Sequence, residues 1–425
     1  MAIIKIPYSR GFVDLKVPDQ NLKGILESKA HHFKTDDPEA TIVRKALDKP
    51  IASPPLRDLA VGKKKVVIIT SDHTRPVPSS ITLPIVLKEI REGNPEADIT
   101  ILIATGFHRP TTEAEMLNKF GEELVKNERF INHNCFDEST LVKVGILPSG
   151  GELWLNRMAM EADLLISEGF IEPHFFAGFS GGRKSVLPGV AGRTTVLANH
   201  CSQFIYHEKS RTGVLEGNPI HKDMLYAAEA ANLAFILNVV IDANKKIISA
   251  YAGNRELAHK EGCEFVTGLA SVEPVPADIV VTSNGGYPLD QNIYQTVKGM
   301  TAAEATAKED AVIIIASACN DGHGGEAFYQ TFLDHKTAQD VMDTIMKIPM
   351  EKTIPDQWES QILARLLIKH KVILVTDQCD SKMVTDMHML HAYTLEEAMK
   401  MAFEIKGKDA SVTVIPDGVS VIVKQ

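Results

Sequence analysis

The sequence is poor in cysteine, with 5 among 425 residues, at positions 135, 201, 263, 319 and 379. They are scattered, and no two of them form a CxxC pair. This arrangement indicates neither a disulfide framework nor a zinc knuckle. Cysteine usage of this kind is typical of a protein that works in a reducing compartment, so we expect a cytoplasmic location.

Long apolar runs and an excess of positive charge are also missing. No apolar run approaches the length of a membrane span, and the residues after Met1 lack the apolar core of a signal peptide. Lys and Arg number 45 against 55 Asp and Glu, a net charge of -10. This balance argues against nucleic acid or an acidic membrane as a partner, while a local cationic pocket remains compatible with it.

The composition is that of an ordinary globular protein. Along the chain, patterns typical of strands alternate with patterns typical of helices. With 44% hydrophobic residues in 425 positions, the chain has material for two or three domains. Buried-strand patterns such as Val66–Thr70 are each followed by a helical pattern, which predicts an α/β fold with mainly parallel, Rossmann-like sheets. The Pro-containing segment 272–276 reads as a linker. We therefore expect two α/β domains, 1–271 and 277–425, with the active site in the cleft between them.

A glycine-rich stretch at 168–189 follows a predicted strand at 163–167. Gly178, Gly181 and Gly182 permit a tight turn and a close approach of the backbone to a ligand, and two cations, Arg183 and Lys184, come directly after them. Exposed N–H groups beside cations form a physically sensible anion cradle, although the spacing is not that of a Walker motif. A tight surface loop is the alternative.

A cluster of polar residues follows the end of each of three predicted strands. The clusters are Asp72, His73 and Arg75; His108 and Arg109; and His174, Arg183 and Lys184. In a parallel sheet these ends meet along one edge, where open α/β sheets bind their ligands.

The chemistry of single residues leaves alternatives open. His108 and His174 are candidate general bases because a neutral imidazole titrates near neutral pH. His200 has no second histidine at metal-ligand spacing, so by spacing it is a weak metal candidate. Arg75 and Lys298 could bind a carboxylate. Residue chemistry indicates a two-domain enzyme acting on a small anion, with a metal-assisted hydrolase or a phosphate-binding module as alternatives.

Longer motifs resemble a known family. Ser-Asp-His-Thr-Arg-Pro-Val-Pro at 71–78, Thr-Gly-Phe-His-Arg-Pro at 105–110 and the stretch 168–189 are similar to nickel-dependent lactate racemases. The same holds for Asn-Gly-Gly-Tyr-Pro-Leu-Asp-Gln-Asn-Ile-Tyr-Gln at 284–295, Asp-Gly-His-Gly-Gly-Glu at 321–326 and Thr-Ile-Pro-Asp-Gln-Trp at 353–358. The resemblance covers essentially the whole chain.

The resemblance implies a cofactor, the nickel-pincer nucleotide, a pyridinium-3-thioamide-5-thiocarboxylic acid mononucleotide that accessory enzymes must make. It implies covalent attachment at Lys184 and His200 as the protein ligand of nickel. It also implies His108 and His174 as the acid/base pair. The further implied contacts are Asp72, Arg75, Ser180, Gly181, Gly182 and Trp358 for the cofactor, and Arg75, Tyr294, Gln295 and Lys298 for the substrate.

The implied reaction interconverts D- and L-lactate by hydride transfer to and from the cofactor, through pyruvate. Racemisation or epimerisation of another short 2-hydroxy acid is one alternative. A non-catalytic phosphate- or nucleotide-binding module is an alternative of a different class.

Overall fold

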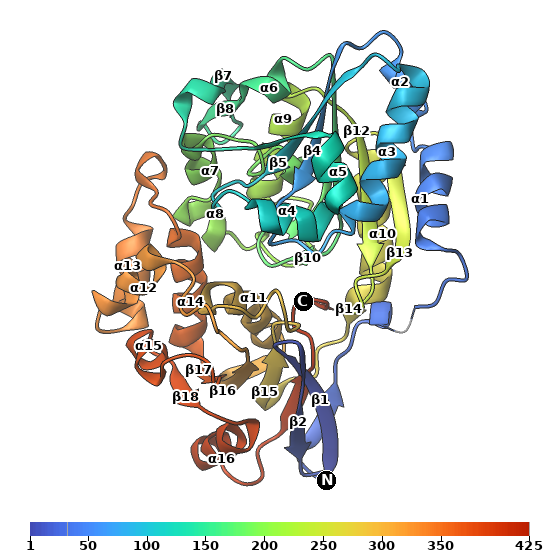
Figure 1. Ribbon diagram of the computed structural model, residues 1–425. Coiled ribbons are helices and arrows are strands. Elements are labelled where there is room, and N and C mark those ends of the chain that lie inside the picture. Colours follow the sequence, from blue (N-terminus) through green and yellow to red (C-terminus); the bar gives the residue numbers. More distant parts are fainter. Residues whose placement is uncertain (32, 425) are drawn as a thin grey trace.

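The computed structural model of the chain describes residues 1–31 and 33–424, and it contains two six-stranded sheets, in the upper and lower halves of Figure 1. The first sheet has the order β13 (Ile247–Gly253), β12 (Leu233–Ile241), β9 (Leu164–Phe170), β4 (Lys65–Ser71), β5 (Asp98–Ala104) and β6 (Arg129–Asn132). The second has the order β18 (Leu390–Ala392), β17 (Lys371–Val375), β16 (Ala307–Ala316), β15 (Ala277–Ser283), β19 (Val412–Ile415) and β3 (Leu22–Ile25).

Both sheets are mainly parallel. In the first sheet the edge strand β13 alone runs antiparallel to its neighbour, and in the second sheet every pair is parallel. The predicted α/β class is confirmed. The sequence of residues 234–250 predicts a hairpin that turns around Asp242–Asn244, and the antiparallel pair β12–β13 confirms it.

Helices connect and cover the strands of each sheet. Around the first sheet lie α1 (Glu39–Asp48), α2 (Leu56–Ala60), α3 (Ser79–Gly93), α4 (Glu113–Phe120), α5 (Glu122–Asn127), α6 (Arg157–Met160), α7 (Arg193–Asn199), α8 (Ser202–Tyr206), α9 (Pro219–Ala230) and α10 (Leu257–Ala270). Around the second lie α11 (Ile293–Glu304), α12 (Glu326–Leu333), α13 (Ala338–Met346), α14 (Gln357–Lys369), α15 (Ser381–Asp386) and α16 (Leu395–Lys406).

Short elements complete the chain. They are β1 (Ala2–Tyr8), β2 (Gly11–Val17), β7 (Leu141–Ile146), β8 (Glu152–Asn156), β10 (Pro173–His174), β11 (Gly178–Phe179), β14 (Ser271–Val272) and β20 (Ile422–Val423), with the 3-10 turns η1 (Lys29–His31), η2 (Glu138–Thr140), η3 (Gly182–Ser185) and η4 (Met350–Lys352).

The side chains of the second sheet divide between two apolar layers because successive residues of a strand point to opposite faces. Ile279 and Val281 of β15 pack with α16 and the β1–β2 hairpin, whereas Val280 joins the layer that contains α11 and α14. A strand that is buried on both faces reads as a continuous apolar run, which is the pattern found at 279–281.

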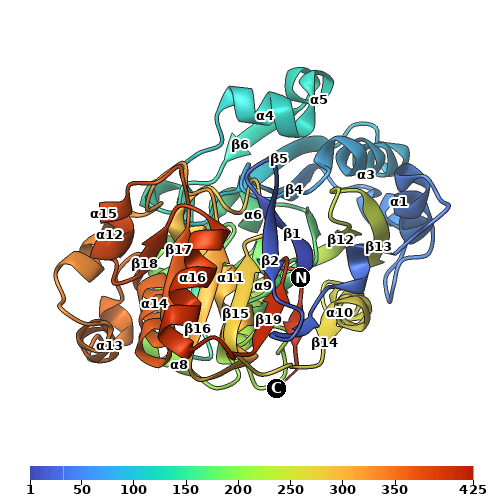
Figure 2. The same cartoon turned by 90° about the horizontal axis from the view of Figure 1, so that it is seen from below.

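The first 25 residues pack with the second sheet, although most of that sheet comes from the C-terminal part of the chain. Strand β3 pairs with β19, and Ile4, Ile6 and Leu15 of the β1–β2 hairpin are buried against the second sheet. The hairpin lies beside β15 and β19 in Figure 2. The predicted division into 1–271 and 277–425 stays a prediction, but these N-terminal strands pack with the second region rather than the first.

Local capping signals in the sequence predict two helix starts, one with Thr112 and Glu115 as a capping box and one with Asn218 as N-cap before Pro219, and the structure confirms both. Thr112 caps α4, and its side chain and that of Glu115 form the reciprocal bonds of a capping box. Asn218 caps α9, with Pro219 as the first helical residue.

Two local predictions are wrong in detail. The stretch from Glu168 was expected to leave the strand, but β9 continues to Phe170 because its backbone remains paired with β12. The sequence pattern predicts a helix from about Glu359 to Ile368 with Trp358 before it, but α14 starts earlier and Trp358 lies in its first turn. No helix in residues 1–31 and 33–424 combines the length and apolar character needed to cross a membrane.

Candidate active site

A cavity of about 620 Å³ lies between the ends of the β4, β5 and β9 strands and the helices α11 and α14. Loops from neighbouring parallel strands open into it, since Ser71 at the end of β4 pairs with Ala104 at the end of β5. Every residue predicted for the site lines this cavity: Asp72, Arg75, His108, His174, Ser180, Gly181, Gly182, Lys184, His200, Tyr294, Gln295, Lys298 and Trp358. The sequence did not predict that Asp72 would meet His108.

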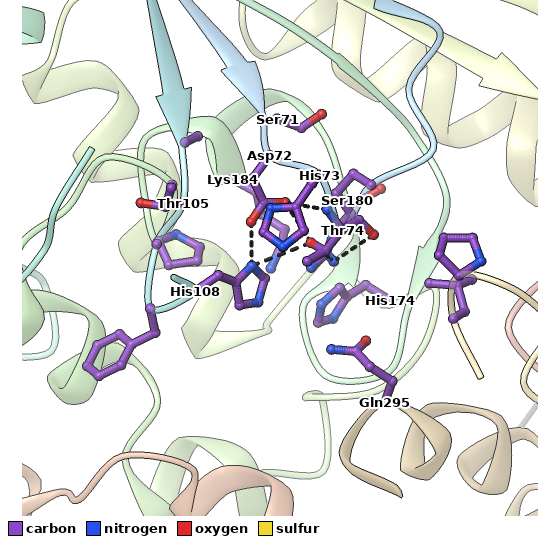
Figure 3. Close-up of a pocket in the computed structure, with 18 of the residues that line it drawn as sticks. Ser71, Asp72, His73, Thr74, Thr105, His108, His174, Ser180, Lys184 and Gln295 are labelled. Carbon is purple, nitrogen blue, oxygen red and sulfur yellow. Dashed lines mark hydrogen bonds and ion pairs between the residues drawn. The ribbon is translucent and has the colours of Figure 1, made fainter. Parts of the chain in front are cut away.

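Asp72 and His108 form a close pair (Figure 3). Oδ2 of Asp72 lies 2.6 Å from Nδ1 of His108, and Oδ1 accepts a 2.6 Å hydrogen bond from the Thr74 hydroxyl. Burial disfavours ionisation of Asp72, but attraction to His108 and Arg75 outweighs it and holds the pKa of this carboxyl well below its ordinary value. An ionised carboxylate at Nδ1 can only accept a hydrogen bond, so it orients the ring of His108.

Arg75 is tied to the same carboxylate through Thr74. Its Nη1 donates to the Thr74 hydroxyl oxygen at 2.9 Å, and its main-chain carbonyl accepts a 2.8 Å bond from Lys119. Both contacts restrict where the guanidinium can lie. Neither Thr74 nor Lys119 was singled out from the sequence, because a hydroxyl and a helical lysine carry no motif.

His174 stands in a different electrostatic environment from His108. It lies in β10, which pairs with β11, and its ring centroid is 4.6 Å from that of Phe176. Burial and the nearby cations Lys184 and Lys298 hold the pKa of His174 well below its ordinary value. The ring is therefore neutral at neutral pH.

Lys184 lies in η3, directly after two glycines with positive φ, Gly181 at 76° and Gly182 at 52°. A Cβ at Gly181 would come within 2.7 Å of the Phe170 carbonyl oxygen, so this close turn needs glycine. Burial, with Arg183 next in effect, lowers the pKa of Lys184 well below its ordinary value. A neutral amine is the nucleophilic form of lysine, which fits covalent attachment of a cofactor there.

The main-chain contact of His200 fixes which of its ring nitrogens could bind a metal. Nδ1 lies 3.0 Å from the carbonyl oxygen of Val196, which fixes the lone pair of the neutral ring on Nε2. Burial, with Lys184 next, lowers the pKa of His200 to about 3. No three His, Cys, Asp or Glu side chains converge as a metal site within residues 1–31 and 33–424. A single neutral imidazole fits a metal whose other donors come from a cofactor.

The second region contributes α11 and α14 to the cavity. Trp358 Nε1 donates to the Tyr294 hydroxyl at 2.7 Å, and the Lys298 ammonium donates to Gln295 Oε1. The Trp358 ring lies 5.0 Å from that of His200 and 5.9 Å from that of Phe107. Trp358 thus joins the two regions across the cavity.

Glu359 is a cavity residue that the sequence did not indicate. It is buried, and its Oε1 has no hydrogen-bond partner among the described residues. Burial raises the pKa of Glu359 and lowers that of Lys298, and the attraction between the two groups opposes both shifts. A glutamate in the first turn of a helix is common for capping reasons, so its type gave no signal.

Two polar residues of the predicted clusters, and the histidine of the 321–326 motif, have structural contacts of their own. Arg109 is directed to Glu115, with Nη1 2.8 Å from the carboxylate, and Arg183 is 1% exposed and turned into the protein. His323 accepts the amide N–H of Gly325 at 3.1 Å, which shapes its turn.

Comparisons with known proteins cover the whole chain. Models described as the lactate racemase N-terminal domain and C-terminal domain match residues 8–213 and 272–423. A lactate racemase from Thermoanaerobacterium thermosaccharolyticum is 59% identical over 425 residues, 100% of both chains. One from Lactiplantibacillus plantarum is 54% identical over 424 residues, with the same coverage.

Solved structures agree with the sequence comparison. The lactate racemase apoprotein from T. thermosaccharolyticum superposes with a TM-score of 0.96 over 100% of both chains, at 59% identity. A Thermotoga maritima protein, 20% identical, has a TM-score of 0.66 over 88% of this chain and 99% of its own, and it shows the fold alone. The chain belongs to the lactate racemase family and is thus an isomerase of the racemase type.

Proposed function

We propose that this chain interconverts D- and L-lactate. The observation that carries the proposal is the meeting of two imidazoles, His108 and His174, with the cations Arg75 and Lys298 in one cavity. Two relatives that are 59% and 54% identical over their full length bear the name lactate racemase. The cavity offers a place for a small anion and an acid/base group from each of two segments.

The proposed reaction removes a hydride rather than a proton from Cα. The Cα–H of a 2-hydroxy acid is very weakly acidic because the adjacent carboxylate is already charged. Loss of a hydride together with the hydroxyl proton gives planar pyruvate, and return of the hydride to the other face inverts the centre. A nickel-pincer nucleotide, attached at Lys184 and ligated by His200, would accept and return that hydride when it is bound.

The chain itself binds and orients the substrate carboxylate. Arg75 suits a carboxylate because its guanidinium can donate two parallel hydrogen bonds, and the 2.9 Å contact with Thr74 restrains it. Lys298 adds a second positive charge from α11. Binding from both regions would hold pyruvate while its two faces exchange.

The histidines handle the hydroxyl proton. Asp72 lies 2.6 Å from Nδ1 of His108, which leaves Nε2 of that ring to accept a proton from the substrate. A second group is needed because the two enantiomers present their hydroxyls from different sides, and His174 lies on a separate segment, the short strand β10. Burial between the two regions, with Trp358 against Phe107, would exclude water from the keto acid.

The testing experiment combines intact mass with a chiral assay. The chain is expressed with cofactor-building accessory enzymes, denatured, weighed and mapped by peptide. We expect a nucleotide-sized adduct on Lys184, its loss in Lys184→Arg, and its retention in the exposed control Lys88→Arg. Purified protein should convert either lactate enantiomer to a racemate.

The outcomes separate the parts of the proposal. An unmodified chain that racemises lactate would overturn the cofactor assignment. A chain that carries the cofactor and racemises another 2-hydroxy acid but not lactate would change the substrate assignment and leave the proposed mechanism standing. A loaded chain that binds such acids and turns none over would favour the binding-module alternative.

A further inference from the structure

The two histidines of the cavity differ in what meets their Nδ1 atoms. Nδ1 of His108 lies 2.6 Å from a carboxylate oxygen of Asp72. Nδ1 of His174 accepts the main-chain N–H of Ala177 at 3.3 Å. A carboxylate and an amide N–H impose opposite requirements on a ring nitrogen, so the contacts fix where each ring carries its hydrogen.

The requirement at His108 is a hydrogen on Nδ1. An ionised carboxylate can only accept a hydrogen bond, and Asp72 is ionised because its pKa lies well below the ordinary value. Its other oxygen already accepts from the Thr74 hydroxyl at 2.6 Å. A neutral His108 therefore has its lone pair on Nε2, where it can take a proton.

The requirement at His174 is a lone pair on Nδ1. A main-chain N–H can only donate, so the nitrogen that receives it carries no hydrogen. The ring is neutral, since burial, Lys184, Lys298, Arg75 and Arg183 all disfavour a second proton. The single hydrogen of a neutral His174 is then on Nε2.

We infer that His108 and His174 stand in opposite tautomers, with the accepting lone pair on Nε2 of His108 and on Nδ1 of His174, and that the Ala177 amide is the group that sets the second. The part of these tautomers in catalysis rests on the proposed function. The tautomers themselves rest only on the two contacts.

A buried guanidinium holds the peptide group that directly follows the Ala177 N–H in the same turn. Nη2 of Arg183 donates to the Ala177 carbonyl oxygen at 2.7 Å, and Nη1 donates to that of Gly181 at 3.2 Å. Arg183 is itself fixed by His221, whose Nδ1 accepts from Nε at 3.0 Å. The neutral acceptors around it anchor the turn between His174 and Lys184. Arg183 is thus a positioning residue that anchors the turn from which the Ala177 N–H reaches His174.

Because their tautomers are opposite, the two rings interact with a substrate in different ways: His108 can accept a proton on Nε2, and His174 can donate a hydrogen bond from Nε2. When a lactate hydroxyl meets Nε2 of His108, the O–H bond breaks, an N–H bond forms there, and Asp72 stabilises the resulting imidazolium. His174 in its tautomer donates a hydrogen bond from Nε2 to an oxygen. It cannot take a proton on Nε2 until it gives up the one already there. At rest the site therefore holds His108 ready as a base and His174 ready as a hydrogen-bond donor. His174 can act as the base for the other enantiomer only after its Nε2 has lost its hydrogen.

Nitrogen NMR on protein without cofactor tests the tautomers directly. The chain is labelled with ¹⁵N-histidine, and long-range correlations to the ring hydrogens distinguish pyrrole-type from pyridine-type nitrogens. His108→Gln and His174→Gln assign the signals by loss. Two other rings serve as references: His133, whose Nδ1 accepts from Asn156 at 3.0 Å, and His335, whose Nδ1 lies 2.7 Å from the Thr331 carbonyl oxygen.

At neutral pH we expect a protonated Nδ1 for His108, matching His335, and a pyridine-type Nδ1 for His174, matching His133. A protonated Nδ1 on His174, in either a neutral or a charged ring, would overturn the inference. Because the measurement needs no turnover, an enzyme inactive on lactate with these tautomers would defeat the proposed function and leave the inference standing.

The positioning role of Arg183 is tested in the same spectra. Arg183→Lys removes the forked contacts to the turn, and we expect the His174 nitrogens to move toward the average of two tautomers while His133 stays unchanged. If that variant does not fold, His221→Gln is used instead, because it changes only the contact between residue 221 and Nε of Arg183. An unchanged His174 signal in a folded variant would rule out the positioning role.

Discussion

The carboxylate of Asp72 lies 2.6 Å from Nδ1 of His108 although the residues are 36 positions apart in the chain. They meet because β4 and β5 are parallel neighbours, and the loops after them leave the same sheet edge. The charges that act most strongly on His174 are all positive. The cavity thus gives its two histidines opposite electrostatic surroundings.

We predict that Asp72→Asn lowers kcat for lactate racemisation by roughly 10²–10⁴-fold. The amide cannot stabilise the protonated His108 ring and no longer requires a hydrogen on Nδ1. Thr74→Ser keeps the hydroxyl that Asp72 accepts and serves as the control. Steady-state rates and the mass of the adduct are measured together, and a rate within a factor of a few of wild type would refute the orienting role.

Arg75→Met should raise KM for lactate strongly. The same variant should change the amount of bound nucleotide only slightly. Loss of a charge-assisted contact costs about 1.5–3 kcal/mol, which corresponds to at least a tenfold change. Lys119→Met, which frees the Arg75 carbonyl, should shift KM in the same direction by less. An unaltered lactate dependence in Arg75→Met would give this residue a structural role alone.

Glu168→Ala should destabilise the first region by about 2–4 kcal/mol. The buried carboxylate accepts from Thr70 at 2.6 Å, Thr82 at 2.6 Å and Ser79 at 3.0 Å, so its removal leaves three hydroxyls without this acceptor. Denaturant unfolding of the variant measures the change. The exposed Glu123→Gln is the control, and equal stability of the two variants would contradict the prediction.

Acid should destabilise the fold through His133. Burial lowers the pKa of this ring to about 4, against an ordinary value of 6.5. Between these pH values the unfolded chain binds more protons than the folded one, so stability falls as pH falls through this window. The contribution reaches roughly 3 kcal/mol by pH 4.

The measurement is the free energy of unfolding at several pH values for wild type and His133→Gln. We expect a shallower pH dependence in the variant, because the group that gains the proton on unfolding is gone. The exposed His207→Gln should keep the wild-type slope. Parallel slopes for wild type and His133→Gln would exclude this ring as a source of the acid sensitivity.

Much of the fold follows from local patterns. Continuous apolar runs predict parallel strands buried on both faces, and the strands at 65–71 and 98–104 occur where they were expected. Capping signals predict the starts of α4 and α9. The predictions of these strands and helix starts are correct because helix caps and strand burial depend on residues that are close in sequence.

The placement of β1–β3 could not be predicted in this way. Pairing of β3 with β19 joins residues 22–25 to residues 412–414, and a short strand of four residues carries too little pattern to specify a partner so distant. The site residue Glu359 could not be predicted either, because it too depends on a contact between residues distant in the sequence. Its burial beside Lys298 depends on how α11 packs against α14, and its own neighbours in the chain do not report that contact.

The sequence by itself determined the chemistry that is available: two histidines, a lysine after glycines, and cations at strand ends, in motifs long enough to indicate the family. Only the tertiary structure decided the state of each group. Parallel packing of β4 beside β5 gives His108 a carboxylate. The turn that Arg183 anchors gives His174 an amide. A tautomer or a pKa depends on charges and hydrogen bonds within a few ångströms, and those neighbours come from distant parts of the chain.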